Sequence, residues 1–163
     1  MGLLNAALAS MVLLLSFLGS SPLLQDKSRP CPQPNEATDP KFRPGQVWQY
    51  KTRPHERSST LTILRVESLP KVGTIIHIRV DKVRLRNCTG GPEPDNFQHM
   101  PFARDSIERS VTKLVNEGSV PDFQAGYDEW RSACGGVYTI TVAGAIQVAE
   151  DTFRKNLGCE PER

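Results

Sequence analysis

Residues 59–86, STLTILRVESLPKVGTIIHIRVDKVRLR, decide the fold because two strand-like runs follow each other across a short turn. Thr60 to Val66 and Ile75 to Leu85 are rich in Thr, Ile, Leu and Val, which suit a pleated and half-buried surface. Leu69-Pro70-Lys71-Val72-Gly73 lies between the two runs and has the proline and glycine of a turn. We therefore predict that this stretch forms the central β-hairpin of the protein.

The apolar pattern of the second strand changes phase halfway along. Apolar residues alternate on one face up to Val80, whereas Val83 and Leu85 have the opposite parity. Because side chains alternate with a period of two, this change predicts a β-bulge or a sharp bend at Asp81. The outer face is interpreted as a solvated surface in preference to a basic docking surface. Its residues are His77, Arg79, Asp81, Lys82, Arg84 and Arg86.

Length and composition fit one folded domain. The chain has 163 residues, of which 38% are hydrophobic, and its net charge is +2 from 20 basic and 18 acidic side chains. This balance favours neither a polyanionic nor an acidic partner, and no nucleic-acid partner is expected. We predict a single α+β domain over residues 45–159. It follows a proline-rich leader or linker over 22–44 and precedes a charged tail over 160–163.

The N-terminal segment, residues 1–21, resembles a signal peptide. Ala6 to Leu18 is almost continuously apolar and is followed by the small residues Gly19, Ser20 and Ser21. The run is shorter than the roughly 20 residues of a transmembrane helix, and no Lys or Arg precedes it. We predict export to the periplasm or the extracellular space after signal cleavage, with no further membrane association. The alternative is a membrane anchor formed by this segment.

Four cysteines, Cys31, Cys88, Cys134 and Cys159, form an even set without a CxxC pair. This pattern favours two disulfides in an oxidising compartment over a metal site. Of the three possible pairings we favour Cys31 with Cys159 and Cys88 with Cys134. The alternative is that some of the four are buried free thiols.

The rest of the chain predicts short strands and amphipathic helices. Strands are expected at 46–52, where Trp48 is a core residue, and at 137–142, with a surface loop at 87–98. A helix is expected to start at Asp105, which can form a capping box with Glu108, and to end at Gly118. Further helices are expected at about 122–133 and 144–156, the first with a core-facing aromatic stripe of Phe123, Tyr127 and Trp130.

These elements predict a small antiparallel sheet, made of a three-strand meander plus one later strand. Two or three helices are expected to pack on one face of this sheet, in the order β-β-β-α-α-β-α.

No catalytic or cofactor motif is present. The sequence has no GxSxG, HExxH, phosphate-loop, dinucleotide or EF-hand pattern, so no cofactor and no metal are expected. We expect the three histidines, His55, His77 and His99, to be separate and exposed. If one is functional, we favour His99, because it lies beside Phe102 and Arg104 at the entry to a helix.

Two classes of function remain open. We favour a small exported, non-catalytic binding or interaction domain of unknown ligand, which uses the outer sheet face or the loop around residues 87–102. The alternative is an exported hydrolase that uses a loop histidine held in a pocket near a carboxylate or a serine. The candidate binding residues are His99, Phe102, Arg104, His77, Arg79 and Arg84.

Overall fold

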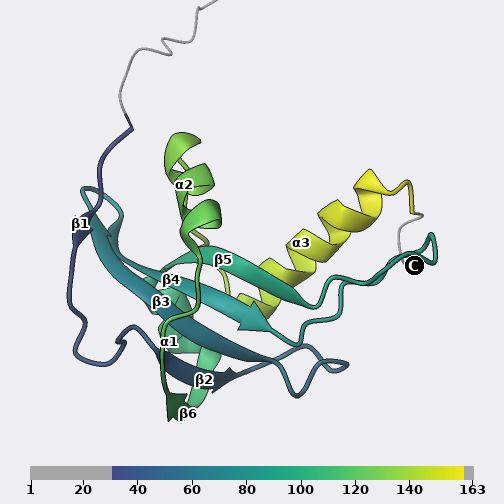
Figure 1. The fold of residues 1–163 in the computed structure, drawn as a ribbon, viewed down its shortest axis with the longest axis horizontal. Coiled ribbons are helices and arrows are strands. Elements are labelled where there is room, and N and C mark those ends of the chain that lie inside the picture. The colour runs from purple at the N-terminus through teal and green to yellow at the C-terminus, as the bar shows by residue number, and fades with distance from the viewer. Residues whose placement is uncertain (1–30, 160–163) are drawn as a thin grey trace, which may run out of the picture.

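The predicted hairpin lies in the middle of the molecule (Figure 1). A computed structural model describes residues 31–159, with β3 at Thr60–Leu69 and β4 at Gly73–Asp81. Lys71 and Gly73 adopt φ angles of 69° and 85°, and the Val72 N–H donates to the Leu69 carbonyl at 3.1 Å. The turn between the two strands therefore forms where the sequence predicts it.

Residues 31–159 contain six strands in one antiparallel sheet and three helices. The spatial order is β5-β4-β3-β2-β6, and the short β1 pairs with β3 outside this path. The predicted α+β class with an antiparallel sheet is therefore confirmed. The other strands are β1 Asn35–Glu36, β2 Gln46–Tyr50, β5 Asn96–Ala103 and β6 Val111–Glu117, and the helices are α1 Arg104–Ser110, α2 Gln124–Ser132 and α3 Val142–Asn156.

Two bulges flank the middle of β4. In β3 Leu64 is the extra residue, because its two neighbours pair with consecutive residues of β4. In β5 the register shift places the extra residue at Gln98–His99, opposite Arg79. The irregularity predicted at Asp81 is a bend, because β4 ends there and Lys82 turns the chain with a φ of 58°. Bulges re-aim side chains, so the strands beside β4 depart from regular alternation at this point.

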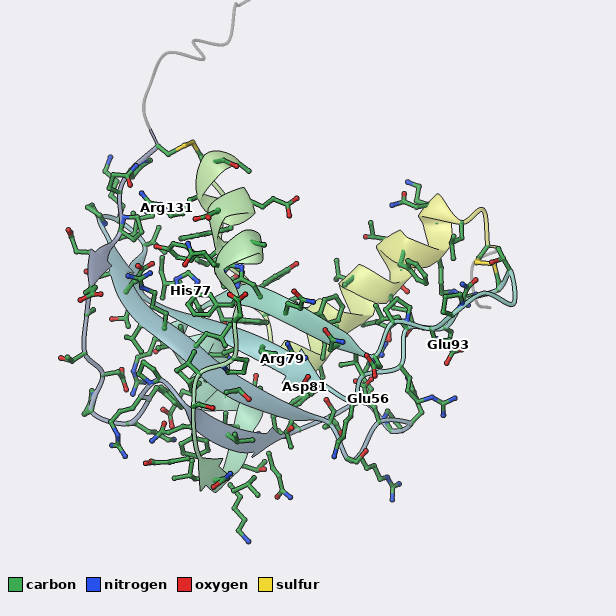
Figure 2. The ribbon with its side chains drawn as sticks, in the orientation of Figure 1. Glu56, His77, Arg79, Asp81, Glu93 and Arg131 are labelled. Atoms are coloured by element: carbon green, nitrogen blue, oxygen red, sulfur yellow. A yellow bond between two sulfur atoms is a disulfide. The ribbon has the colours of Figure 1, made fainter. Side chains whose placement is uncertain are left out.

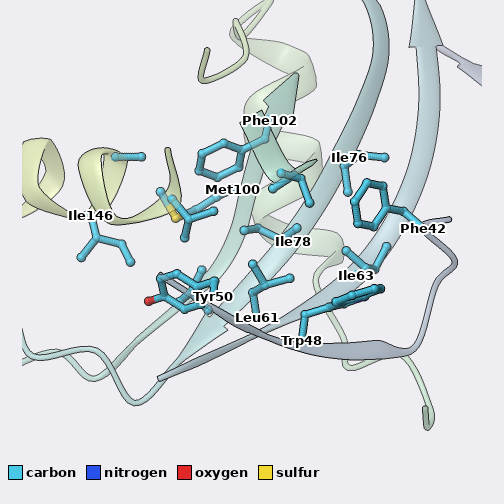
Figure 3. Packing of buried hydrophobic residues seen from close by; sticks show 14 of the residues in the cluster. Phe42, Trp48, Tyr50, Leu61, Ile63, Ile76, Ile78, Met100, Phe102 and Ile146 are labelled. Atoms are coloured by element: carbon cyan, nitrogen blue, oxygen red, sulfur yellow. The ribbon is translucent and has the colours of Figure 1, made fainter. Parts of the chain in front are cut away.

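One face of the sheet forms the hydrophobic core (Figure 3). The helices α1 and α3 pack on this face, where their residues Ile107 and Ile146 are fully buried. Each such isoleucine contributes about 1.5–3 kcal/mol through burial. The strand residues of the core include Trp48, Tyr50, Leu61, Ile63, Val66, Ile76, Ile78, Val80, Met100 and Phe102.

The remaining helix, α2, lies on the opposite face of the sheet. Its Tyr127 is buried and donates a hydrogen bond to Glu67, whereas the preceding strand residue, Val66, points into the core. Because neighbouring strand residues point to opposite faces, the contact with Glu67 places α2 across the sheet from α1 and α3. Within residues 31–159 two helices thus lie on one face of the sheet, and the short helix α2 lies on the other.

Two disulfides form, as predicted, but they join different cysteines from those expected. Cys31 bonds to Cys134 at the end of α2, and Cys88 bonds to Cys159 after α3, as the two yellow sulfur pairs in Figure 2 show. The predicted pairs of Cys31 with Cys159 and Cys88 with Cys134 are therefore wrong. The reason is that α3 runs away from α2 (Figure 1), so that its end lies beside the loop of Cys88.

The segment 105–117 differs most from its prediction. The helix ends at Ser110, and residues 111–117 form the edge strand β6, which pairs with β2. Asp105 is not the cap, since α1 begins after Ala103 without a side-chain cap. Leu114 and Val115, which would lie on one apolar stripe if this segment were helical, are exposed by 38% and 51%. The β-branched residues of VTKLV favour a strand, and pairing with β2 outweighs the helical spacing.

Two further segments exchange strand and loop relative to the prediction. Residues 96–103, expected as a loop and a helix entry, form the strand β5 at the edge of the sheet. An edge strand tolerates Pro101, because one of its sides needs no backbone N–H donors. Residues 137–142, expected as a strand, make only a parallel bridge between Phe102 and Tyr138, and α3 already begins at Val142.

The predicted leader, Ala6 to Leu18, lies outside the described residues. Within residues 31–159 no helix is both long and apolar enough to cross a bilayer. The two disulfides indicate an oxidising compartment.

Candidate functional site

A row of three polar side chains crosses the sheet beneath α2. His77 is fully buried in the middle of β4, and its Nδ1 lies 2.8 Å from Nε2 of His99 on β5. On the other side, His77 Nε2 lies 3.1 Å from Oε2 of Glu67 on β3. These last two atoms are not aligned as a hydrogen bond, and within residues 31–159 neither has another hydrogen-bond partner. The row thus connects a buried carboxylate to a partly exposed imidazole.

The second oxygen of Glu67 is fully occupied. Its Oε1 accepts a hydrogen bond from the Tyr127 hydroxyl at 2.8 Å and lies 2.9 Å from Nε of Arg65. The Arg65 guanidinium also lies over the Tyr127 ring, 5.1 Å from its centroid. A hydroxyl donor and a cationic guanidinium therefore both contact one oxygen of this carboxyl group.

Aromatic side chains from α2 enclose the two imidazoles. Trp130 and Tyr127 present T-shaped contacts to His77, with ring centroids 4.9 and 5.4 Å away. The ring of Phe123 is stacked with His99 at 6.2 Å. Gly126 permits this close packing, since a Cβ there would lie 2.9 Å from the His99 Cβ. Figure 2 shows His77 beneath α2, on the side of the sheet that this helix covers.

The enclosure keeps both imidazoles neutral. Burial and the nearby His99 and Arg65 lower the pKa of His77 to about 3. Burial alone lowers the pKa of His99 to about 4. Burial and the hydrogen bond to Glu67 raise the pKa of Tyr127 above its usual value. At neutral pH the row therefore consists of two neutral imidazoles that end at one carboxylate.

His99 opens into a surface groove between α2 and β5. The groove has a volume of about 360 Å³, and a smaller hollow beside it shares Pro101, Trp130 and Tyr138. Its aromatic walls are Phe97, Trp130 and Tyr138, and its polar residues include His99 and Glu129. Among the described residues the lining includes no lysine or arginine. The groove is thus aromatic, and the charged residue of its described lining is a carboxylate, Glu129.

A larger hollow beside β1 is a weaker candidate. It has a volume of about 480 Å³ and is lined by residues 36–38, Pro44, Arg65 and Val66. Its two charged side chains, Glu36 and Arg65, pair with each other at 3.3 Å. Paired charges and open walls leave no group there that is specifically directed at a ligand.

The structure brings together two of the residues singled out from the sequence. His77 and His99 are in contact, and His77 is fully buried, so the expectation of separate, exposed histidines is wrong for this pair. They meet because they lie on neighbouring strands, with the β5 bulge at His99 itself. His55 is exposed and lies in the loop between β2 and β3.

The other four candidate residues lie elsewhere. Phe102 is fully buried in the core on the opposite face of the sheet. Arg104 pairs with Asp39 at 2.8 Å, and Arg79 pairs with Asp81 at 2.7 Å. Arg84 is exposed, with Glu93 at 3.8 Å. They form no common site with the two histidines.

Sequence reasoning missed Glu67, Tyr127 and Trp130 as members of this site. The spacing of Tyr127 and Trp130 predicted a core-facing stripe, and it does identify the buried side of α2. Nothing in the sequence indicates which face of the sheet α2 covers. Glu67 gives only a weak indication in the sequence. A carboxylate next to the predicted strand Thr60 to Val66 requires either a buried partner or solvent, and the sequence does not show which.

A second buried polar cluster lies between α3 and the loop after β2. Arg53 donates to both oxygens of Glu56 at 2.9 Å and to Glu150 at 2.6 Å, and Arg86 donates to Glu150 at 2.6 Å. Burial raises the pKa of Glu150, but the hydrogen bonds from the two arginines outweigh it, so this pKa lies below its usual value. Both oxygens of each carboxylate have a partner. We name these four residues the ion-pair network.

No protein-family model, curated protein or solved structure matches this chain significantly. Within residues 31–159 no group of three or more His, Cys, Asp or Glu side chains is placed to hold a metal ion.

Proposed function

We propose that this protein is a small exported binding domain whose ligand occupies the groove between α2 and β5. The observation behind the proposal is the groove wall, which combines Phe97, Trp130 and Tyr138 with Glu129. Concave sites lined by aromatic residues with a few polar groups are the usual form of small-molecule sites. The groove includes Phe97, His99, Met100 and Pro101 from the segment around 87–102, which was one of two binding surfaces expected from the sequence.

The charge of the wall favours a ligand that is an organic cation with an apolar body. Glu129 supplies one negative charge, and the described lining has no cationic side chain to oppose a positive ligand. Burial keeps His99 neutral at physiological pH, because it lowers the pKa of this residue to about 4. Aromatic faces attract cations by about 0.5–2 kcal/mol each, so three rings and a carboxylate together select for positive charge.

Trp130 offers a direct measurement of binding. The chain has two tryptophans, and Trp48 is buried in the core, so Trp48→Phe leaves Trp130 as the single fluorophore. We expect benzyltrimethylammonium to change Trp130 fluorescence saturably, and benzyl alcohol and benzoate to bind more weakly. Glu129→Gln should lower the affinity for the cation several-fold, in line with about 0.5–1 kcal/mol for an exposed charge pair.

The control is Glu93→Gln, which removes an exposed carboxylate outside the groove. It should leave the affinity for benzyltrimethylammonium unchanged. Equal affinity for the cation and for benzoate, or no saturable signal with any of the three probes, would contradict the proposal.

A further inference from the structure

The contacts of the row favour one arrangement of its protons. His77 Nε2 and Glu67 Oε2 lie 3.1 Å apart without hydrogen-bond alignment, and a carboxylate oxygen repels a nitrogen lone pair at this distance, so the favoured tautomer of His77 has its proton on Nε2. In a neutral imidazole the other nitrogen is then an acceptor, so His77 Nδ1 accepts from Nε2 of His99 at 2.8 Å. His99 Nδ1 is therefore left with a free lone pair.

That lone pair faces the groove. Within residues 31–159, His99 Nδ1 has no hydrogen-bond partner and is not among the buried polar atoms that lack one. It lies next to Gly126, where a Cβ would be 3.8 Å away, and Gly126 is itself part of the groove wall. An unprotonated nitrogen on the wall of an aromatic groove has the position of a general base.

We propose that Glu67, His77 and His99 form a proton relay, and that His99 Nδ1 acts as a general base for the hydrolysis of a neutral acyl ester bound in the groove. The groove shares its location with the proposed binding function, but the relay does not depend on a cationic ligand. A phosphate ester is a poor substrate here, because the described lining offers Glu129 and no basic side chain to an anion.

The step balances without a further reactant. The oxygen of a water molecule bonds to the ester carbonyl carbon while His99 Nδ1 takes one water proton. The leaving alkoxide or phenolate departs with the electron pair of the broken C–O bond. The imidazolium of His99 can share its charge with His77 and the Glu67 carboxylate through the row, and it then returns the proton to the leaving group or to solvent.

The surroundings of His99 keep this base unprotonated. On β3, Arg65 contacts Glu67 at the buried end of the row. On α2, Tyr127 donates to Glu67, and Arg131 lies 5.8 Å from the Tyr127 ring centroid. Glu129 lies on the groove wall. With the pKa of His99 lowered to about 4, its lone pair is free over the whole neutral range. Because this also makes it a weaker base than a free imidazole, its catalytic advantage must come from its position beside the bound ester. His99 is the catalytic residue of the proposal, and Glu67 and His77 are positioning residues.

The activity test uses p-nitrophenyl acetate at pH 7 with the full-length protein. We expect hydrolysis faster than that by the same concentration of N-acetylhistidine, and His99→Gln should reduce it to that level or below. General base catalysis typically contributes about 10²–10⁴-fold. Glu67→Gln should lower the rate about tenfold while His99 remains in place. His55→Gln removes an exposed histidine outside the row and should change nothing.

The overturning result is equal hydrolysis by the wild type and His99→Gln, or a full rate in Glu67→Gln. A second measurement does not require variants that fold. In the wild type, ¹⁵N chemical shifts of the two rings should show protonated Nε2 and unprotonated Nδ1 at both His77 and His99. Protonation of His99 at Nδ1 would refute the relay, whereas binding of benzyltrimethylammonium in the groove would be unaffected.

Discussion

The ion-pair network and the row beneath α2 are both buried and polar, but they differ in how completely their atoms are paired. In the network every carboxylate oxygen of Glu56 and Glu150 accepts a hydrogen bond. In the row, Glu67 Oε2 and His77 Nε2 have none among the described residues. The network consists of formal charges, whereas the row contains two neutral imidazoles next to one carboxylate.

This difference separates a fully paired cluster from the one that we propose to be functional. Buried polar atoms in folded proteins are nearly always paired, and an exception requires an explanation. The network links α3 to two loops, and every carboxylate oxygen in it is paired, so stability accounts for it. The row ends at a groove, where His99 Nδ1 has no hydrogen-bond partner among the described residues. The comparison leads to three predictions on stability and binding.

The largest expected effect is loss of stability when the network is broken. Glu150→Ala removes the common partner of Arg53 and Arg86 and leaves Arg53 buried with one carboxylate. Breaking a buried pair from one side costs about 3–5 kcal/mol. Urea denaturation at pH 7 should show that Glu150→Ala lowers the free energy of unfolding by this amount.

Glu93→Ala is the matched control, because Glu93 pairs with Arg84 at 3.8 Å on the surface. Its effect should lie within about 0.5 kcal/mol. Similar losses in the two variants would mean that the network is no more important than an exposed pair. Binding of benzyltrimethylammonium by folded Glu150→Ala should match the wild type, since the network lies outside the groove.

The second effect is a pH dependence that belongs to the row. The pKa values of His77 and His99 in the folded protein are about 3 and 4, below the ordinary value of about 6.5 for an unfolded chain. The unfolded state therefore binds more protons below pH 6.5, and stability falls as the pH decreases from 7 toward 4. The slope is about 1.4 kcal/mol per pH unit for each histidine.

The network titrates in a lower range, because the pKa of Glu150 is lowered from the value of a free carboxyl group. Its contribution is lost only as the pH falls below about 4.5. Urea midpoints at pH 7, 6 and 5 therefore report on the histidines of the row and not on the network. His99→Gln should reduce the loss of stability per pH unit. Constant stability from pH 7 to 5 would show that the imidazoles are not held neutral.

The smallest effect on stability is expected from Gly126→Ala. The new Cβ would lie 2.9 Å from the His99 Cβ, so α2 must move away from β5. Overpacking costs about 1–3 kcal/mol, and the higher helix propensity of alanine offsets about 1 kcal/mol of this. Stability should change by roughly 1 kcal/mol, whereas groove affinity for benzyltrimethylammonium, followed by Trp130 fluorescence, should fall clearly.

Gly118→Ala is the control for this substitution, since a Cβ at Gly118 meets nothing within 4 Å. It should leave the affinity unchanged. If Gly126→Ala leaves the affinity unchanged as well, the groove does not depend on the close approach of α2 to His99.

Local sequence patterns predicted the hairpin and α2 but not the edges of the sheet. The alternation in β3 and β4 is strong, and Pro70 and Gly73 mark the turn between them. At 111–117 the spacing of the apolar residues fits a helix, but the free edge of β2 selected the strand. Pairing between strands that are distant in sequence cannot be predicted from a short stretch of neighbouring residues.

Only part of the candidate site could be predicted from the sequence, for the same reason. His77 and His99 were identified as residue types capable of chemistry, but their contact depends on β4 and β5 being neighbours and on the bulge at His99. Glu67 joins them from a third strand. The cysteine count predicted two disulfides, whereas their pairing depended on where α2 and α3 end.

That pairing has a consequence for proteolysis. Along the chain the bonds join the first cysteine to the third and the second to the fourth, so the two covalent loops interlock in sequence instead of nesting. A protease that cuts once in each of any two of the three intervals between cysteines still leaves every cysteine-containing fragment covalently connected. With the nested pairing, cuts on either side of the inner loop would release it. Nicked protein should therefore keep its mass until a reductant is added.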